Sequence, residues 1–182
     1  MDKAEPSVRD SLLDAASWFV PEAARLPGVQ RIAFIGSIAS QRPDPKDLDL
    51  LVWVASQTDL TPLAALGRRL KGRLQSQNLG ADVFLADEHG NYLGRTCSWK
   101  ECGPGFRASC DAEHCGRRHY LHDDLATVRL AAEVIAAPPV DLWPVVARRA
   151  QLPADVEGFL ASLNEPHNYR VNLSAGGTNE VK

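Results

Sequence analysis

The first half of the chain alternates short apolar runs with longer segments of helical periodicity. The short runs lie at Arg31–Ile35, Asp47–Val54 and Ala81–Ala86 and have the length and composition of buried strands. Between the last two, the segment Leu60–Leu74 places its leucines on one stripe, which predicts a helix packed on a sheet. This alternation predicts an α/β layer in which helices cover a small sheet.

Apolar positions also recur at helical spacing in the N-terminal segment, from Ser7 to Leu26, where Ser7 is placed to cap the first turn. Pro21 is expected to break this helix into two pieces. A brief helical turn is expected at Ile38–Gln41, and Pro43 ends it because proline lacks an amide donor. The sheet is thus expected to follow an amphipathic helix.

The second half is less regular. Glu88–Arg118 is rich in glycine and holds all four cysteines, as expected of an insertion. Helical spacing returns at His122–Ala137, shorter helices are expected over Asp141–Ala150 and Ala154–Leu163, and the polar tail Pro166–Lys182 is expected to be poorly ordered. The predicted divisions are a core at 1–87, a cysteine-rich insertion at 88–120, C-terminal helices packing on the core at 121–165 and a flexible tail at 166–182.

Composition narrows the class of protein. A chain of 182 residues suits one compact domain, and no apolar run approaches the roughly 20 residues that span a bilayer. The N-terminal sequence lacks the layout of a signal peptide, so a soluble cytoplasmic protein without membrane partners is expected. The net charge of −3 gives no general attraction to nucleic acid, and DNA is not an expected partner.

The most informative stretch opens the second predicted strand with two aspartates. Because strand side chains alternate, Asp47 and Asp49 point to one face while Leu48 and Leu50 point into the core. Their Cα atoms are then about 6 to 7 Å apart, close enough for both carboxylates to share hard divalent cations. Unpaired carboxylates beside apolar surface need a partner, and a metal ion is one.

Three further residues extend this candidate site. Gly36 permits a tight turn, and Ser37 offers a hydroxyl and an amide at the start of a helical turn, which favours phosphate oxygens. Asp82, inside the third apolar run, is the best candidate for a third carboxylate. Asp87 has the opposite strand parity and ranks below it.

Together these residues resemble the polymerase-β-like nucleotidyltransferase superfamily, especially its minimal members, over about Leu26–Ala86. The resemblance implies a mixed sheet flanked by helices, two magnesium ions, and transfer of a nucleoside monophosphate from a nucleoside triphosphate to an acceptor hydroxyl. The matching pattern is Gly36-Ser37, nine residues, Asp47-Leu48-Asp49-Leu50, a helix, and a strand that carries Asp82.

Carried over by position, the resemblance implies that Gly36 and Ser37 grip the triphosphate and that Asp47 and Asp49 ligate the metals. Asp82 would bind the metal that activates the acceptor and accept its proton. This is a two-metal arrangement, in which one ion acidifies the attacking hydroxyl and the other neutralises the leaving pyrophosphate.

Two other functions stay open at this point, because a fold can outlast its chemistry. One is an inactive module of the same fold that uses basic and aromatic residues of the insertion, such as Arg117 and Arg118, to bind RNA or a protein. The other is an antitoxin-like member that pairs with a toxin, which only the resemblance implies. The acceptor (small molecule, RNA or protein) and the preferred nucleotide, ATP included, are not specified by the sequence.

The cysteines follow the pattern C-x4-C, seven residues, C-x4-C. Four thiolates in two such pairs can surround one tetrahedral Zn²⁺ at a structural site. Two disulfides or free thiols are the alternatives, and a neighbouring histidine, His114, is either a substitute ligand or a solvated side chain. The predicted zinc ligands are Cys97, Cys102, Cys110 and Cys115.

Overall fold

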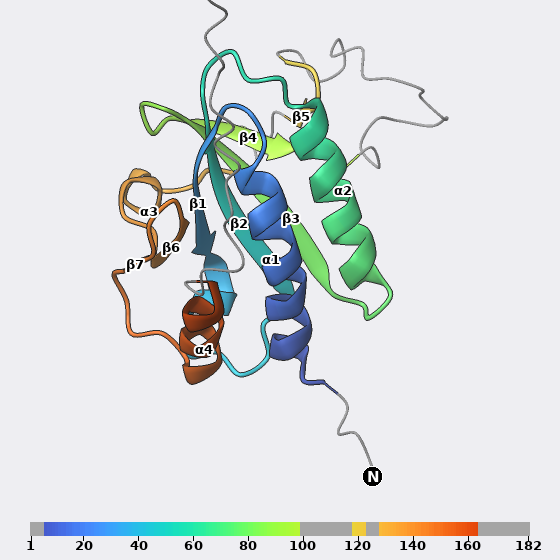
Figure 1. Ribbon diagram of the computed structural model, residues 1–182, viewed down its shortest axis with the longest axis vertical. Coiled ribbons are helices and arrows are strands. Elements are labelled where there is room, and N and C mark those ends of the chain that lie inside the picture. Colours follow the sequence, from blue (N-terminus) through green and yellow to red (C-terminus); the bar gives the residue numbers. More distant parts are fainter. Residues whose placement is uncertain (1–5, 99–117, 123–127, 164–182) are drawn as a thin grey trace, which may run out of the picture.

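The computed structural model describes residues 6–98, 118–122 and 128–163, which build a seven-stranded mixed sheet (Figure 1). The strand order is β5-β4-β3-β2-β1-β6-β7, and within the described residues only β2 and β3 pair in parallel. The strands are β1 (Val29–Ile35), β2 (Asp47–Val54), β3 (Gly80–Asp87), β4 (Tyr92–Thr96), β5 (Leu121–His122), β6 (Val140–Trp143) and β7 (Ala147–Arg148). The helices are α1 (Val8–Ala24), a 3-10 turn η1 (Gly36–Ala39), α2 (Thr61–Gln75), α3 (Ala132–Ala136) and α4 (Ala154–Leu163).

Helices lie on both faces of the sheet. The main core joins one face to α1, α2 and α4, and α1 and α2 lie side by side across it (Figure 1). A smaller apolar cluster on the opposite face joins Leu51 and Trp53 of β2 to Ile135 of α3. The predicted α/β class, a sheet flanked by helices, is confirmed.

Several predicted elements are found in place. The strand predicted at Asp47–Val54 is β2 itself, and the helices predicted at Leu60–Leu74 and Ala154–Leu163 are α2 and α4. Ser7 caps α1 as predicted, with its side chain accepting from the Asp10 amide. These elements were predictable because each has a clear apolar pattern over its whole length and polar residues that mark its ends.

The predicted break at Pro21 is wrong, because α1 runs through it without interruption. Proline removes one backbone hydrogen bond from the helix. Phe19, Val20 and Ala23 are buried around it and hold both turns against the core. Tertiary packing therefore outweighs the local breaking signal.

The C-terminal region differs more from the prediction. The helix expected at Asp141–Ala150 is wrong, since β6 and β7 form there and β6 pairs with β1. Pairing with β1 buries Val140 and Leu142, a gain that a surface helix would not give. The long helix predicted at His122–Ala137 is likewise not found, since His122 belongs to β5 and α3 begins only at Ala132.

Strands β4 and β5 were not predicted either. β4 lies inside the segment expected to be a cysteine-rich insertion, and it joins the sheet beside β3. β5 then pairs with β4, and the Cys97 amide donates to the Tyr120 carbonyl at 2.8 Å. The segment between Ser98 and Arg118 therefore starts and ends at one edge of the sheet. The predicted flexible tail lies outside the described residues.

No helix in the described ranges is both long enough and apolar enough to cross a bilayer.

Candidate functional site

The three predicted carboxylates lie on one face of the sheet. Leu48 and Leu50 are fully buried against the helices, so Asp47 and Asp49 face the other way, as alternation requires. In the parallel pairing of β2 with β3, Asp49 is directly opposite Asp82. Neighbouring strands are about 4.8 Å apart, so these two side chains emerge as close neighbours.

Burial and neighbouring negative charges together raise the pKa of Asp49. Its pKa is raised from 3.8 to about 6, chiefly because burial disfavours the charged form and further because the charges of Asp82 and Asp47 repel it. A carboxyl group in this condition gains from any bound cation. Asp49 is therefore the centre of the acidic site, meaning Asp47, Asp49 and Asp82.

Two glycines make room for these carboxylates. Gly36 has a φ of +71°, and a Cβ atom there would lie 2.2 Å from Asp49 Oδ2. A Cβ atom on Gly80 would lie 2.0 Å from Asp47 Oδ1. Gly36 was singled out from the sequence, whereas Gly80 was missed because its importance depends on the register that pairs it with Asp47.

Asp82 has cationic neighbours that sequence reasoning also missed. Arg95 Nη1 lies 3.2 Å and Lys71 Nζ 3.6 Å from Asp82 Oδ1. Arg95 comes from the unpredicted strand β4, on the same face of the sheet. Lys71 reaches from α2 because β4 pairs with β3 only from Phe84 onward, which leaves the start of β3 without a strand on that side among the described residues.

Among residues 6–98, 118–122 and 128–163, no three His, Cys, Asp or Glu side chains converge as a ready-made metal site. The Asp82 carboxylate is instead paired with Lys71 and Arg95. Asp87, the lower-ranked candidate, lies at the far end of β3 and accepts from the Asn91 amide and side chain. It shapes the turn between β3 and β4.

The loop before β2 forms a pocket beside the acidic site. Gly36 and Ser37 open η1, and the Ser40 amide and hydroxyl both donate to the Ser37 carbonyl. The pocket has a volume of about 430 Å³ and contains two cations, Arg42 and Lys46, which were not predicted to contribute. Its lining is Ser37, Arg42, Pro43, Asp44, Lys46 and Asp47. Asp47 thus belongs both to the acidic site and to this pocket, where Asp44 and Asp47 balance the charges of Arg42 and Lys46.

Of the four predicted zinc ligands, the described residues include Cys97. Cys97 follows β4 and is buried, with its carbonyl accepting from Arg68 Nη1 at 3.4 Å. Cys102, Cys110 and Cys115 lie outside the described residues, as do His114 and Arg117. The zinc site therefore stays a prediction.

No protein-family model, curated protein or solved structure matches this chain.

Proposed function

We propose that this protein is a magnesium-dependent nucleotidyltransferase with a polymerase-β-like fold. It moves a nucleoside monophosphate from a nucleoside triphosphate to an acceptor hydroxyl. The observation that carries the proposal is the acidic site, three aspartates on one face of paired strands β2 and β3, with Asp49 packed against Gly36 at the start of η1. In a sheet with no catalytic role, replacing these mutually repelling carboxylates would stabilise the fold.

The donor set fits magnesium. Hard divalent cations prefer carboxylate oxygens, and the raised pKa of Asp49, caused by burial and by Asp82 and Asp47, is relieved when a cation enters. Asp47 and Asp49 would hold the ions, and Asp82 would join them by exchanging Lys71 and Arg95 for metal. When bound, the ions would acidify the acceptor hydroxyl and neutralise the leaving pyrophosphate.

The chain's own residues supply the remaining tasks. Ser37 would donate its amide and hydroxyl to phosphate oxygens, while Arg42 and Lys46 would offset the charge of the triphosphate in the neighbouring pocket. Asp82 would accept the proton of the acceptor hydroxyl at its carboxylate. Lys71 and Arg95, once Asp82 turned to the metal, would lie close enough to the site to contact phosphate or acceptor.

A second candidate function rests on the same ion pairs. Lys71 and Arg95 already neutralise Asp82 without metal, as expected in a fold that has lost catalysis. Such a module would bind RNA or a protein partner, in the latter case as an antitoxin-like protein. It would bind equally well after Asp49→Asn, because no metal is involved.

Transfer of label tests the proposal without knowledge of the acceptor. The protein is incubated with Mg²⁺ and each α-labelled nucleoside triphosphate, using small-molecule, RNA and protein fractions of a cell extract as acceptor sources. We expect one fraction to be labelled by wild type and by the control Asp14→Asn, which alters an exposed carboxylate on α1. Label that appears equally with Asp49→Asn, or in no fraction, would contradict the proposal.

A further inference from the structure

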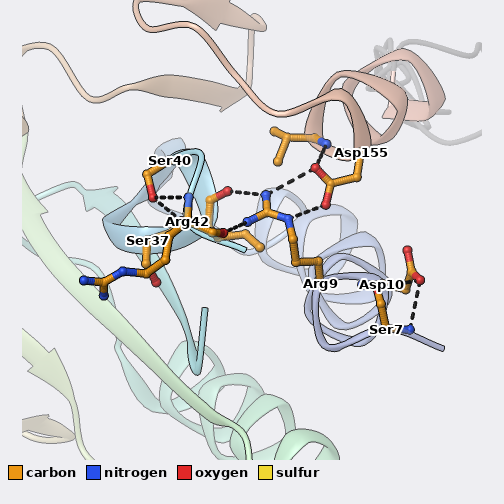
Figure 2. Close-up of polar contacts among 9 residues, drawn as sticks. Ser7, Arg9, Asp10, Ser37, Ser40, Arg42 and Asp155 are labelled. Carbon is orange, nitrogen blue, oxygen red and sulfur yellow. Dashed lines mark hydrogen bonds and ion pairs between the residues drawn. The ribbon is translucent and has the colours of Figure 1, made fainter. Parts of the chain in front are cut away.

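Arg9 of α1 binds α4, a helix that is far away in the sequence. It lies in the first turn of α1, and its side chain is only 13% exposed. Its Nε donates to Asp155 Oδ2 at 2.5 Å and its Nη2 to Asp155 Oδ1 at 3.2 Å, so the guanidinium grips the first turn of α4 with two bonds (Figure 2). Paired donors of this kind fix the plane of the guanidinium.

The same guanidinium also holds the loop that lines the pocket. Nη2 donates to the Ile38 carbonyl at 2.8 Å, and Nη1 donates to the Arg42 carbonyl at 2.9 Å. Figure 2 shows that the side chain of Arg42 extends away from Arg9, so only its backbone is held. The two carbonyls are on either side of Ser40, and the two lining residues of the pocket, Ser37 and Arg42, lie directly before and at the end of this held segment.

The ends of this loop are buried, at Ile38 and Ala39 and at Pro45, but its middle has few other means of holding its shape. Residues 40–44 are all exposed, and Pro43 and Pro45 have no amide hydrogen to donate. The backbone hydrogen bonds of residues 36–46 are local ones, such as that to the Ser37 carbonyl, apart from the Gly80 amide donating to the Lys46 carbonyl near β2. Arg9 therefore supplies a fixed point from outside the loop.

We propose that Arg9, oriented by Asp155, is a positioning residue that holds the loop from Ile38 to Arg42 in the shape that receives the phosphates of a nucleoside triphosphate. The inference rests on the proposed function, and it adds that α4 takes part in nucleotide binding without touching the nucleotide. Arg9 itself is turned toward carbonyls and Asp155. It is not assigned a catalytic part.

The chemistry of arginine is needed for this arrangement. A single guanidinium reaches two carboxylate oxygens and two carbonyls in one plane, whereas a lysine ammonium is a point charge that cannot keep all four. Burial alone would raise the pKa of Asp155, but hydrogen bonds from Arg9 and the Val156 amide outweigh it and lower the pKa. Asp155 is therefore ionised at neutral pH.

Hydrogen exchange and nucleotide titration together test the inference. Wild type, Arg9→Lys and Asp155→Asn are compared by exchange of amides in residues 36–46 and by titration with each nucleoside triphosphate and Mg²⁺. The matched control is Arg148→Lys, which alters a second, more exposed arginine pair with α4, that of Arg148 with Glu157 at 2.8 Å. Circular dichroism melts establish that each variant is folded.

We expect Arg9→Lys and Asp155→Asn each to speed exchange in residues 36–46 by about tenfold and to weaken nucleotide binding by about tenfold, with β1 and β2 protected as before. The control should match wild type in both. Unchanged exchange, or faster exchange with unchanged affinity, would overturn the role of Arg9. If wild type binds no triphosphate, the proposed function fails together with this role, and the exchange data alone report whether the Arg9–Asp155 pair orders the loop.

Discussion

At the scale of single residues, Asp49 links the electrostatics of the sheet to its proposed chemistry. Its pKa of about 6 in the folded protein, raised by burial and by Asp82 and Asp47, exceeds the ordinary 3.8. The folded state therefore holds this proton more tightly than the unfolded state. The stability that the protonated group contributes is lost as pH rises from about 4 to about 6.

The sign of this effect gives the first prediction. Asp49→Asn should raise the free energy of unfolding at pH 7 by about 1–2 kcal/mol, below the roughly 3 kcal/mol of the full shift because the site is partly solvated. Below about pH 4 the gain should vanish, because the wild-type carboxyl is then protonated in both states. Urea unfolding across this pH range measures it. A loss of stability at pH 7, with Asp14→Asn unchanged, would show that Asp49 has a structural partner instead.

The glycines beside the carboxylates give a second prediction. Gly36→Ala forces a positive φ on alanine and a Cβ atom against Asp49, and Gly80→Ala places one against Asp47. Each should lower the free energy of unfolding by about 1–3 kcal/mol. Gly72→Ala is the matched control, because its Cβ would meet nothing within 4 Å inside α2 and should stabilise by up to about 1 kcal/mol. Equal effects at all three positions in denaturant unfolding would rule out this steric account.

At the scale of elements, sequence patterns correctly predicted the strands and helices whose formation depends on local periodicity. β2 and the placement of Asp47 and Asp49 on its outer face follow from alternation alone. β4 and β6 are short strands whose formation depends on an available edge, at β3 and β1 respectively, which no local pattern reveals. Arg95 was not predicted as part of the site because its strand, β4, was not predicted.

The basic residues around the site show the same limit. Lys71 belongs to a helix whose leucine stripe was predicted correctly, but its reach to Asp82 depends on where β4 stops. Arg9 lies 146 positions from Asp155, and nothing in either sequence neighbourhood indicates the pair. These contacts depend on which residues the tertiary fold brings together, and sequence periodicity carries no information about that.

The docking of α4 yields a third prediction. Phe159 is buried, and its ring centroid lies 5.3 Å from that of Phe34 in β1. Phe159→Ala should lower the free energy of unfolding by about 3–5 kcal/mol, because it removes a large apolar side chain from a packed core. Urea unfolding provides the measurement, and Val145→Ala, at a side chain with 72% exposure, should change it by less than about 0.5 kcal/mol. A Phe159 variant as stable as the Val145 variant would mean that α4 adds little to the core.

At the scale of the whole molecule, the cysteine-rich segment begins and ends at the sheet edge formed by β4 and β5, with Cys97 buried at one end. We predict one zinc ion per chain, bound by Cys97, Cys102, Cys110 and Cys115. Elemental analysis of protein purified without added metal should find it, and Cys110→Ser should release it. Two disulfides found by mass spectrometry, with no zinc, would instead favour the alternative pairing.

The central claim is that the acidic site binds metal and nucleotide together. The most direct measurement is titration calorimetry of the four nucleoside triphosphates, with and without Mg²⁺, into wild type and the Asp47→Asn, Asp49→Asn double variant. The account predicts magnesium-dependent binding of at least one triphosphate by wild type, and none by the folded double variant. Binding that survives in the double variant, or a wild type that binds no triphosphate with any divalent ion, would contradict it and favour the binding module.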